Sequence, residues 1–480
     1  MNRRMVFFLV GQILKAEAAL LALPLIVSLL YKESGYLSFL ITIGIALVLG
    51  FGLTLISRPK NKVIYAKEGF VVVALAWLVM SAIGALPFVI SGSIPSYVDA
   101  LFETVSGFTT TGSSLIPDVE SLEHGILFWR SFTHWVGGMG VLVFVLAVIP
   151  NFSDRSIHLI RAEMAGPIIG KLVPKAKQTA RILYLIYIAL TVTEMIMLLF
   201  GGMTPFESAV HAFGTAGTGG FGIKGDSISG YSPYCQWVIT AFMLIFGINF
   251  NLFYFILLRK IQVVFKNGEL WAYFGVVAVC VGIITFNIMP LFESFSEAIR
   301  HASFQVASMI TTTGYATSDF NQWPELSKGI MFILMFIGGC AGSTAGGLKL
   351  ARVIILFKMI KKEFNRMLHP RSVNVVKLEG KQVDAPILES TGVYFALYMI
   401  SIILIFFVLS FEPFGFTTNF SAAVSCFNNI GPGFDKIGPM SNFSCYNDFS
   451  TIVLTFAMLL GRLELFPVLI CFSPSTWAKK

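Results

Sequence analysis

The chain has 480 residues, of which 56% are hydrophobic and 12% are charged, and its formal net charge is +8. Soluble globular domains carry about 25% charged residues, so this composition excludes an ordinary soluble protein and indicates a polytopic all-α membrane protein. The basic residues lie in loops between apolar segments rather than on one continuous stretch, so we expect no nucleic acid partner and expect membrane lipid around the chain.

Two hydrophobic segments come first, near Met5–Leu30 and Leu37–Ile56. About 20 apolar residues suffice to cross a bilayer, so both segments are long enough to span it. The first follows two arginines, as a secretory signal would, but it is too long for a signal core, contains charged residues and lacks a small-residue cleavage site. We therefore expect a retained N-terminal pair of transmembrane helices.

Four units of one plan follow: a spanning helix, a shorter apolar stretch, a loop that ends in glycine, and a second spanning helix. The shorter stretches are Tyr97–Phe108, Pro205–Ala216, Ser296–Ile310 and Thr418–Phe427. They are too short to cross, and we predict re-entrant pore helices, which membranes tolerate where the backbone is buried in protein and lines a wet cavity. The expected fold is a helix pair plus four pseudo-fourfold helix, pore-loop, helix repeats around one central pore.

This plan divides the chain into five parts. They are residues 1–67 with the helix pair, 68–150 with the first repeat, 151–268 with a basic loop and the second repeat, 269–386 with the third repeat and its following basic loop, and 387–480 with the fourth repeat.

Each repeat carries one variant of a short phrase that ends on glycine. The phrases are Thr109–Gly112, Gly217–Gly220, Thr311–Gly314 and Asn428–Gly431, and a small residue stands six positions before each final glycine, at Ser106, Gly214, Ser308 and Ser425. A chance repeat rarely keeps such a register, so the four loops are predicted to be equivalent.

A glycine-ended loop can adopt positive φ and aim successive carbonyl groups toward an axis. Rings of carbonyl oxygens replace the hydration shell of K+ in potassium filters. We therefore predict one ion selectivity filter. Its residues are Thr110, Thr111, Gly112, Thr218, Gly219, Gly220, Thr312, Thr313, Gly314, Asn429, Ile430 and Gly431.

Loops rich in Lys and Arg alternate with loops that are poor in them. The longest basic loop holds Lys358, Lys361, Lys362, Arg366, Arg371, Lys377 and Lys381. By the positive-inside rule the basic loops and the N-terminus face the cytoplasm, and the four filter phrases face outside. This common side argues against an inverted-repeat transporter, which would place corresponding motifs on opposite sides.

The second helix of the third repeat is interrupted by a glycine-rich stretch at residues 338–347. Close helix packing explains a GxxxG pair, but not small flexible residues clustered around two glycine pairs. We predict a movable gate loop under the filter, with Lys349 at its cytoplasmic end. The gate residues are Gly338, Gly339, Gly342, Ser343, Thr344, Gly346 and Gly347.

Arg462 lies in the apolar segment Thr451–Phe472, where Glu464 is the other charge. A charge at the bilayer centre costs ~2.5–3.5 kcal/mol and faces a cavity or a partner. One interpretation is an ion pair with Glu464, although residues two apart on a helix do not face each other. We favour the other, in which Arg462 is part of the gate and opposes cation passage when the loop is closed.

Three polar residues stand nine positions before their filter glycines: Glu103, His211 and Gln305. Buried carboxylates and histidines mark proton relays, so a proton-coupling site is one interpretation. We favour a hydrogen-bonded brace behind the filter, because these positions point back from the loop.

Six phrases form a specific combination: S-G-F-T-T-T-G-S, H-A-F-G-T-A-G-T-G-G-F, S-M-I-T-T-T-G-Y, C-F-N-N-I-G-P-G, G-G-C-A-G-S-T-A-G-G-L-K and G-R-L-E. In them the chain closely resembles the TrkH/TrkG/KtrB family of bacterial potassium uptake proteins, over nearly its whole length. The extra helix pair and G-R-L-E resemble TrkH more than the shorter KtrB proteins.

The resemblance implies a homodimer with one pore per subunit, docked on a cytosolic TrkA-like ring of nucleotide-binding subunits in the bacterial inner membrane. It also implies that glycine at all four final filter positions favours potassium, whereas serine is associated with sodium tolerance. Relatives carry a bulkier residue before the paired glycines of the second filter loop, so we expect that wall to be more flexible here.

We therefore expect a potassium-selective permeation protein with K+ as the permeant ion, no organic cofactor and no enzymatic activity. The sequence contains no HExxH, GxSxG or P-loop motif and no dinucleotide fingerprint, so any control by a nucleotide must come from a partner. The competing interpretation is a symporter that moves K+ together with H+ or Na+.

Overall fold

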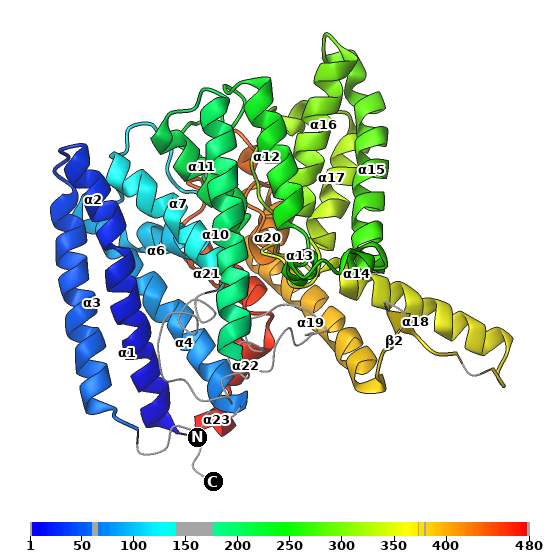
Figure 1. The fold of residues 1–480 in the computed structure, drawn as a ribbon, viewed down its shortest axis with the longest axis horizontal. Coiled ribbons are helices and arrows are strands. Elements are labelled where there is room, and N and C mark those ends of the chain that lie inside the picture. The colour runs from blue at the N-terminus through cyan, green and yellow to red at the C-terminus, as the bar shows by residue number, and fades with distance from the viewer. Residues whose placement is uncertain (1, 60–65, 141–175, 373, 379–380, 478–480) are drawn as a thin grey trace.

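The computed structural model describes residues 2–59, 66–140, 176–372, 374–378 and 381–477. In this part of the chain the protein is a bundle of helices with one short β-hairpin, and both termini lie at the same end (Figure 1). The predicted basic loop at 151–175 lies outside the described residues.

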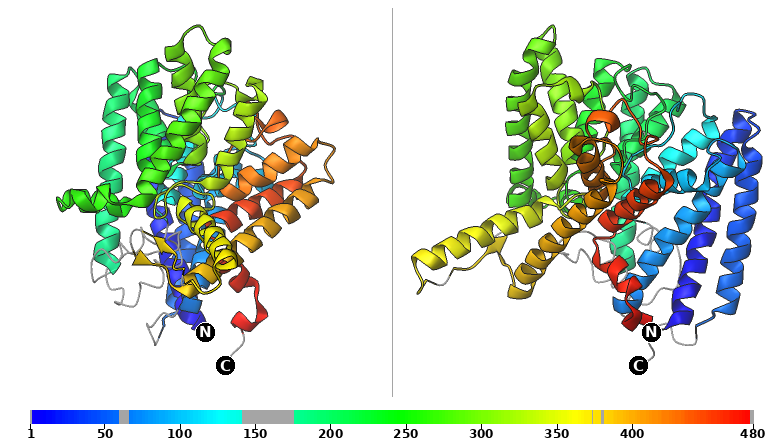
Figure 2. Two further views of the ribbon diagram at one scale, coloured as in Figure 1. Left: turned by 90° about the vertical axis from the view of Figure 1, so that its right-hand side faces the viewer. Right: turned by 180° about the vertical axis from the view of Figure 1, so that it is seen from behind.

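The N-terminal helices lie at one edge of the bundle (Figures 1 and 2). They are α1 (Arg3–Leu20), α2 (Ala22–Leu30) and α3 (Tyr36–Ile56). Helices α1 and α3 pack closely, because Gly11 lies against the Gly50 carbonyl and leaves no room for a larger side chain.

The first repeat begins with α4 and α5 and continues through a pore helix. Its helices are α4 (Ala66–Gly84), α5 (Leu86–Ile90), α6 (Tyr97–Phe108) and α7 (His124–Gly138). Helix α6 starts where the Ser96 side chain accepts a hydrogen bond from the Asp99 amide. The predicted second helix continues to residue 149, and its part from 141 onward lies outside the described residues.

The second repeat contains a sharp bend that was not predicted. Its helices are α10 (Ala176–Phe200), α11 (Pro205–Gly217), α12 (Pro233–Phe246), α13 (Phe250–Leu257) and α14 (Ile261–Phe265). The axes of α12 and α13 differ in direction by 91°. The pore helix α11 starts with a capping box between Thr204 and Glu207, which satisfies its free amides.

The third repeat has the predicted interruption in its second helix. Its elements are α15 (Gly268–Ile288), η2 (Met289–Leu291), α16 (Phe295–Ile310), η3 (Phe320–Gln322), α17 (Glu325–Ile337) and α18 (Leu350–Leu368), followed by the antiparallel strands β1 (Lys377–Leu378) and β2 (Lys381–Gln382). Helix α18 projects from the bundle next to α19 (Figure 1).

The fourth repeat ends differently from the prediction of one helix over Thr451–Phe472. Its elements are α19 (Ala385–Leu409), α20 (Phe416–Asn428), η4 (Asp435–Ile437), α21 (Asp448–Arg462), α22 (Phe466–Phe472) and α23 (Pro474–Trp477). Helix α21 ends at Arg462, and α22 leaves at 118°. Glu464 and Leu465 take positive φ at this break, a conformation that a helix cannot contain.

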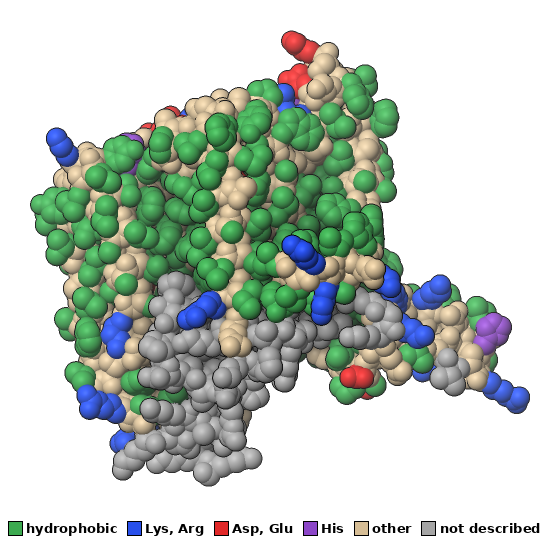
Figure 3. All heavy atoms as spheres, viewed as in Figure 1, with side chains coloured by type: hydrophobic (Ala, Val, Ile, Leu, Met, Phe, Trp, Pro, Cys, Tyr) green, Lys and Arg blue, Asp and Glu red, His purple; other side chains and the backbone are tan. Residues whose placement is uncertain are grey.

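Six helices in the described residues are long and apolar enough to cross a membrane, or up to eight if each bent pair is one span. Hydrophobic side chains cover the face shown in Figure 3, with Lys and Arg near its lower side. The predicted all-α membrane fold with re-entrant helices is confirmed.

Candidate ion filter and gate

The four predicted filter loops have the same backbone conformation. The second residue of each four-residue phrase is left-handed, with φ of 56° at Thr110, 54° at Thr218, 55° at Thr312 and 55° at Asn429. The final glycines also have positive φ: 82° at Gly112, 80° at Gly220, 84° at Gly314 and 107° at Gly431. Threonine rarely adopts this conformation, and such strain persists only where the surrounding structure imposes it.

Each pore helix holds its loop through the small residue that stands six positions before the glycine. The carbonyl oxygen of each small residue accepts a hydrogen bond from a backbone amide of its loop. The pairs are Thr111 N–H to Ser106 O (2.8 Å), Gly219 N–H to Gly214 O (2.9 Å), Thr313 N–H to Ser308 O (2.8 Å) and Ile430 N–H to Ser425 O (3.1 Å). In each loop the left-handed residue stands immediately before the donor amide, and a bond that encloses such a residue turns the chain out of the helix. The repeated register in the sequence is therefore a repeated hydrogen bond.

The four loops contact one another in a closed ring. A Cβ added to any final glycine would overlap a carbonyl oxygen of the next loop: Gly112 meets Gly219, Gly220 meets Thr313, Gly314 meets Ile430, and Gly431 meets Thr111. The order runs from the first loop to the fourth and back to the first. Four backbone segments thus surround one axis, and they approach one another so closely that only glycine fits at the four final positions.

The ring separates two cavities. On one side, all four final glycines line a cavity of about 160 Å³, together with Arg130 and Lys224. On the other side, a cavity of about 60 Å³ is lined by Asn429, the glycine-rich loop and Arg462.

The glycine-rich loop contacts the ring at the end where the pore helices finish. The Gly346 amide donates to Thr312 Oγ1 (2.6 Å), and the Gly347 amide donates to the Asn428 carbonyl (3.1 Å). The loop runs between the end of α17 and the start of α18, as predicted. Gly346 must be glycine at this position, because a Cβ would overlap the Asn428 carbonyl oxygen.

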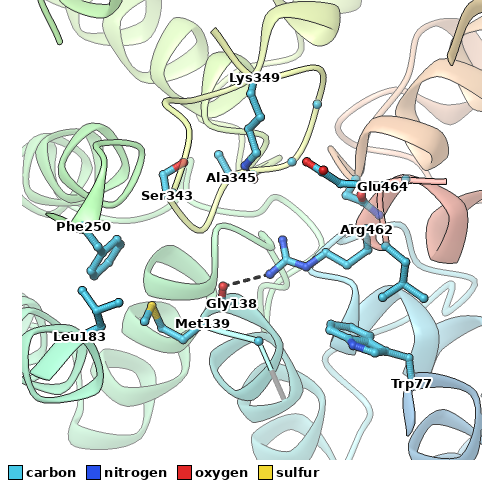
Figure 4. A pocket seen from close by; sticks show the side chains of 17 residues that line it. Trp77, Gly138, Met139, Leu183, Phe250, Ser343, Ala345, Lys349, Arg462 and Glu464 are labelled. Carbon is cyan, nitrogen blue, oxygen red and sulfur yellow. Dashed lines mark hydrogen bonds between the residues drawn. The ribbon is translucent and has the colours of Figure 1, made fainter. Parts of the chain in front are cut away.

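Arg462 joins this loop to the first repeat. Its Nη1 donates to the Thr344 carbonyl (2.9 Å), and its Nη2 donates to the carbonyls of Gly137 (2.6 Å) and Gly138 (2.9 Å). Figure 4 shows the guanidinium in the cavity, between the loop and the Gly138 carbonyl.

Glu464 does not pair with Arg462. Both of its carboxylate oxygens accept from Arg352 of α18, at 2.9 and 2.7 Å, so the ion-pair interpretation of Arg462 is wrong. Lys349 immediately precedes α18 but is only 2% exposed and donates to the Ala345 carbonyl. It belongs to the cavity lining rather than to the surface.

Comparison with known proteins settles the family. Residues 37–479 match the family model described as TrkH: Cation transport protein. The chain belongs to the TrkH family. It is 35% identical over 485 residues to the Trk system potassium uptake protein TrkH of Salmonella typhimurium, covering 99% of this chain and 100% of that one. Against the Trk system potassium uptake protein TrkG of Escherichia coli it is 34% identical, covering 95% and 94%.

The fold comparison agrees. The crystal structure of the potassium transporter TrkH from Vibrio parahaemolyticus matches this TrkH-family chain with a TM-score of 0.89 and 30% identity, covering 100% of both chains. The predicted resemblance is confirmed. The protein is a multi-pass membrane transport protein and not an enzyme.

The three polar residues of the pore helices contact the loops that follow them. Glu103 accepts from Ser114 Oγ (3.0 Å) and from the Leu115 amide (3.1 Å). Gln305 Nε2 donates to the Ser318 carbonyl (3.0 Å). His211 shares a hydrogen bond with Tyr231 Oη (3.1 Å). These contacts agree with the brace that the sequence favoured.

Sequence reasoning missed Arg130 in α7, which links pore helix α6 of this TrkH-family protein to the segment that follows its second loop. Its Nε lies 2.5 Å from Glu103 Oε1, and its Nη1 donates to the Gly222 carbonyl at 2.8 Å. Its guanidinium lies 3.7 Å from the Phe221 ring centroid. The signal was available, because a lone arginine in an apolar helix is the same feature that drew attention to Arg462.

His134 of α7 was also missed, and it packs against the second loop. The imidazole Nδ1 donates to the Gly107 carbonyl (2.7 Å), and Nε2 accepts from the Phe221 amide (3.2 Å). The ring packs so close to Gly219 that a Cβ there would overlap it. Gly219 therefore makes room for a buried imidazole, and the expected flexibility of this wall stays a prediction.

Proposed function

We propose that this chain is the ion-conducting subunit of a potassium uptake system, with K+ as the permeant ion and the twelve filter residues as its selectivity filter. The observation that carries the proposal is the closed ring of four loops, each of which contains a left-handed residue and ends on a glycine that has no room for a side chain. Carbonyl oxygens that face such an axis can replace the hydration shell of K+. The names of the Salmonella and Escherichia relatives support potassium as the ion.

We assign the gate to the glycine-rich loop and Arg462. The loop contacts Thr312 and Asn428 at the end of the ring, where an emerging ion would have to pass. Arg462 adds a positive charge to the cavity beneath, and cations repel each other strongly where the dielectric constant is low. Opening would require the loop to give up its hydrogen bonds to Thr312, Asn428 and Arg462.

Partners are proposed on the side of the basic loops. Relatives are named as parts of a Trk system, which supports a cytosolic TrkA-like nucleotide-binding ring docked on a homodimer in the bacterial inner membrane. Helix α18 offers exposed apolar side chains at Phe357 and Phe364 next to exposed Lys361 and Arg366. This helix starts where the gate loop ends, so a partner that moves α18 would move the loop.

The contacts of the titratable groups argue against a symporter. Glu103 is buried and paired with Arg130, so its carboxylate already has a cationic partner inside the protein. His211 is enclosed between Tyr231 and Tyr315. Neither group is placed to carry a proton along with each K+.

Reversal potentials of the purified protein in planar bilayers or proteoliposomes test the proposal. With K+ and Na+ gradients of opposite direction, the reversal potential should follow the K+ gradient and should not change with a pH gradient. A reversal potential that follows Na+ contradicts the assigned filter. One that moves with the pH gradient supports the symporter instead.

A further inference from the structure

Residues 247–269, called the elbow segment below, connect the end of α12 to the start of α15 and contain α13 and α14. The first end of this segment is hydrogen-bonded to Cys340 and Gly342 of the gate loop, and the second end to Ala341, which lies between them. The bonds are Cys340 N to the Gly247 carbonyl (3.0 Å), Phe250 N to the Gly342 carbonyl (3.1 Å) and Ala341 N to Glu269 Oε1 (2.7 Å). Residues 340–342 are therefore held between the two ends of the elbow segment.

The middle of the elbow segment is turned outward. Its exposed apolar side chains are Ile256, Leu257, Leu258, Ile261, Val263 and Phe265. Its exposed basic side chains are Arg259, Lys260 and Lys266. No Asp or Glu occurs between residues 250 and 268. Figure 3 shows Lys and Arg atoms among hydrophobic ones around α13 and α14.

The position of this surface identifies its partner. Helix α15 follows the elbow segment directly and is apolar, and only 22% of its apolar stretch is buried inside the protein, as expected of a lipid-facing span. At the start of α15, the exposed Trp271 stacks on Phe265 and donates its indole N–H to the Phe265 carbonyl (2.8 Å). Tryptophan concentrates at membrane interfaces. A short segment with apolar and basic side chains at that depth fits acyl chains and anionic headgroups together.

We propose that the elbow segment binds anionic phospholipids through Arg259, Lys260 and Lys266, and that the bound lipid holds the gate loop against the filter. The elbow segment cannot swing away from the bundle while its basic side chains are bound to headgroups. Its two ends then keep residues 340–342 in the position described. The lipid site depends only on the residues of this surface. The effect of the lipid on flux, in contrast, rests on the proposed function of the gate loop.

A local optical signal tests the binding. Brominated phosphatidylglycerol quenches tryptophan fluorescence on contact, and the Trp271 contribution is the difference between the full-length protein and its W271F variant. In neutral phosphatidylcholine vesicles with increasing brominated phosphatidylglycerol, this contribution should be quenched at low lipid fraction. The triple variant R259Q/K260Q/K266Q should require about fivefold more lipid, a modest coupling.

The matched control is K358Q/K361Q/K362Q, which removes the same number of positive charges from α18. It should leave the Trp271 quenching unchanged. Equal quenching of the parent and the elbow variant would overturn the lipid site, as would equal quenching by brominated phosphatidylcholine. Quenching that is lost in both triple variants would mean that net charge, rather than this surface, attracts the lipid, and it would also overturn the site.

Flux measurements test the link to the gate. In proteoliposomes, phosphatidylglycerol should lower K+ flux per folded protein about fivefold for the parent. It should leave the flux of the elbow variant unchanged, and also the flux of a variant that lacks residues 339–346. Lipid-sensitive flux in the deletion variant would overturn the link. If the deletion does not raise flux in neutral vesicles, the proposed gate fails, and the quenching result still decides the lipid site.

Discussion

Arg462 donates a hydrogen bond to the carbonyl oxygen of Thr344 at 2.9 Å, although 118 residues separate them in the sequence. The bond joins the end of α21 in the fourth repeat to the gate loop of the third. The same guanidinium binds two carbonyls at the end of α7 in the first repeat. One side chain thus ties three repeats together beneath the filter.

We expect Arg462→Gln to raise K+ flux. A repulsion of about 1.4 kcal/mol between the guanidinium and the permeating ion would slow passage about tenfold, so its removal should raise flux by that order. The effect should be smaller when residues 339–346 are also deleted, since both changes act on one barrier. Flux per folded molecule in single and combined variants measures this. Arg366→Gln at the exposed end of α18 is the control, and additive effects would contradict a shared barrier.

Deletion of residues 339–346 should by itself raise K+ flux, because the loop is proposed to obstruct the pore. The loop also packs against Thr312 and Asn428, so thermal unfolding must be measured alongside flux. A deletion variant that is folded and conducts less than the parent would show that the loop builds the pore and does not close it.

Gly112→Ser or Gly314→Ser should weaken discrimination of K+ from Na+. Each glycine has positive φ, and an added Cβ would overlap the carbonyl oxygen of Gly219 or Ile430, so the ring of carbonyls must shift. The shift in reversal potential under mixed K+ and Na+ measures the loss. Gly282→Ser on α15 is the control, because a Cβ there meets open space. Selectivity that is unchanged in both filter variants would exclude these loops as the filter.

Arg130→Gln should destabilise the protein by ~3–5 kcal/mol, because it leaves the buried Glu103 carboxylate without its partner. Selectivity should also fall, since Arg130 holds the Gly222 carbonyl beside the filter. Thermal unfolding and reversal potential together measure both effects. The exposed pair Arg366 and Glu363 serves as the comparison, and breaking it should cost less than ~1 kcal/mol. Equal costs for the two pairs would contradict a buried structural role for Arg130.

The pore helices were predictable because residues close in sequence determine where these helices begin and end. Helix α6 matches its predicted range, Tyr97–Phe108, and the caps at Ser96 and Thr204 are residues that favour helix starts. The breaks after α12 and α21 were not predictable. Gly247 and Asn249 stand at the first break, and Glu464 and Pro467 at the second, but each lies in a segment that is otherwise apolar and long enough to be one span. Local signals of this kind did not show by themselves that the helix direction changes there.

By itself, the sequence determined the class of protein, the four repeats and the register of the filter loops, because hydrophobic length and repeated small residues act locally along the chain. Only the tertiary structure decided which carbonyls each glycine faces, that Glu464 pairs with Arg352, and that His134 fills the space beside Gly219. These contacts join residues far apart in sequence. Which residues form these contacts depends on which buried polar groups meet a hydrogen-bond partner when all four repeats pack around one axis.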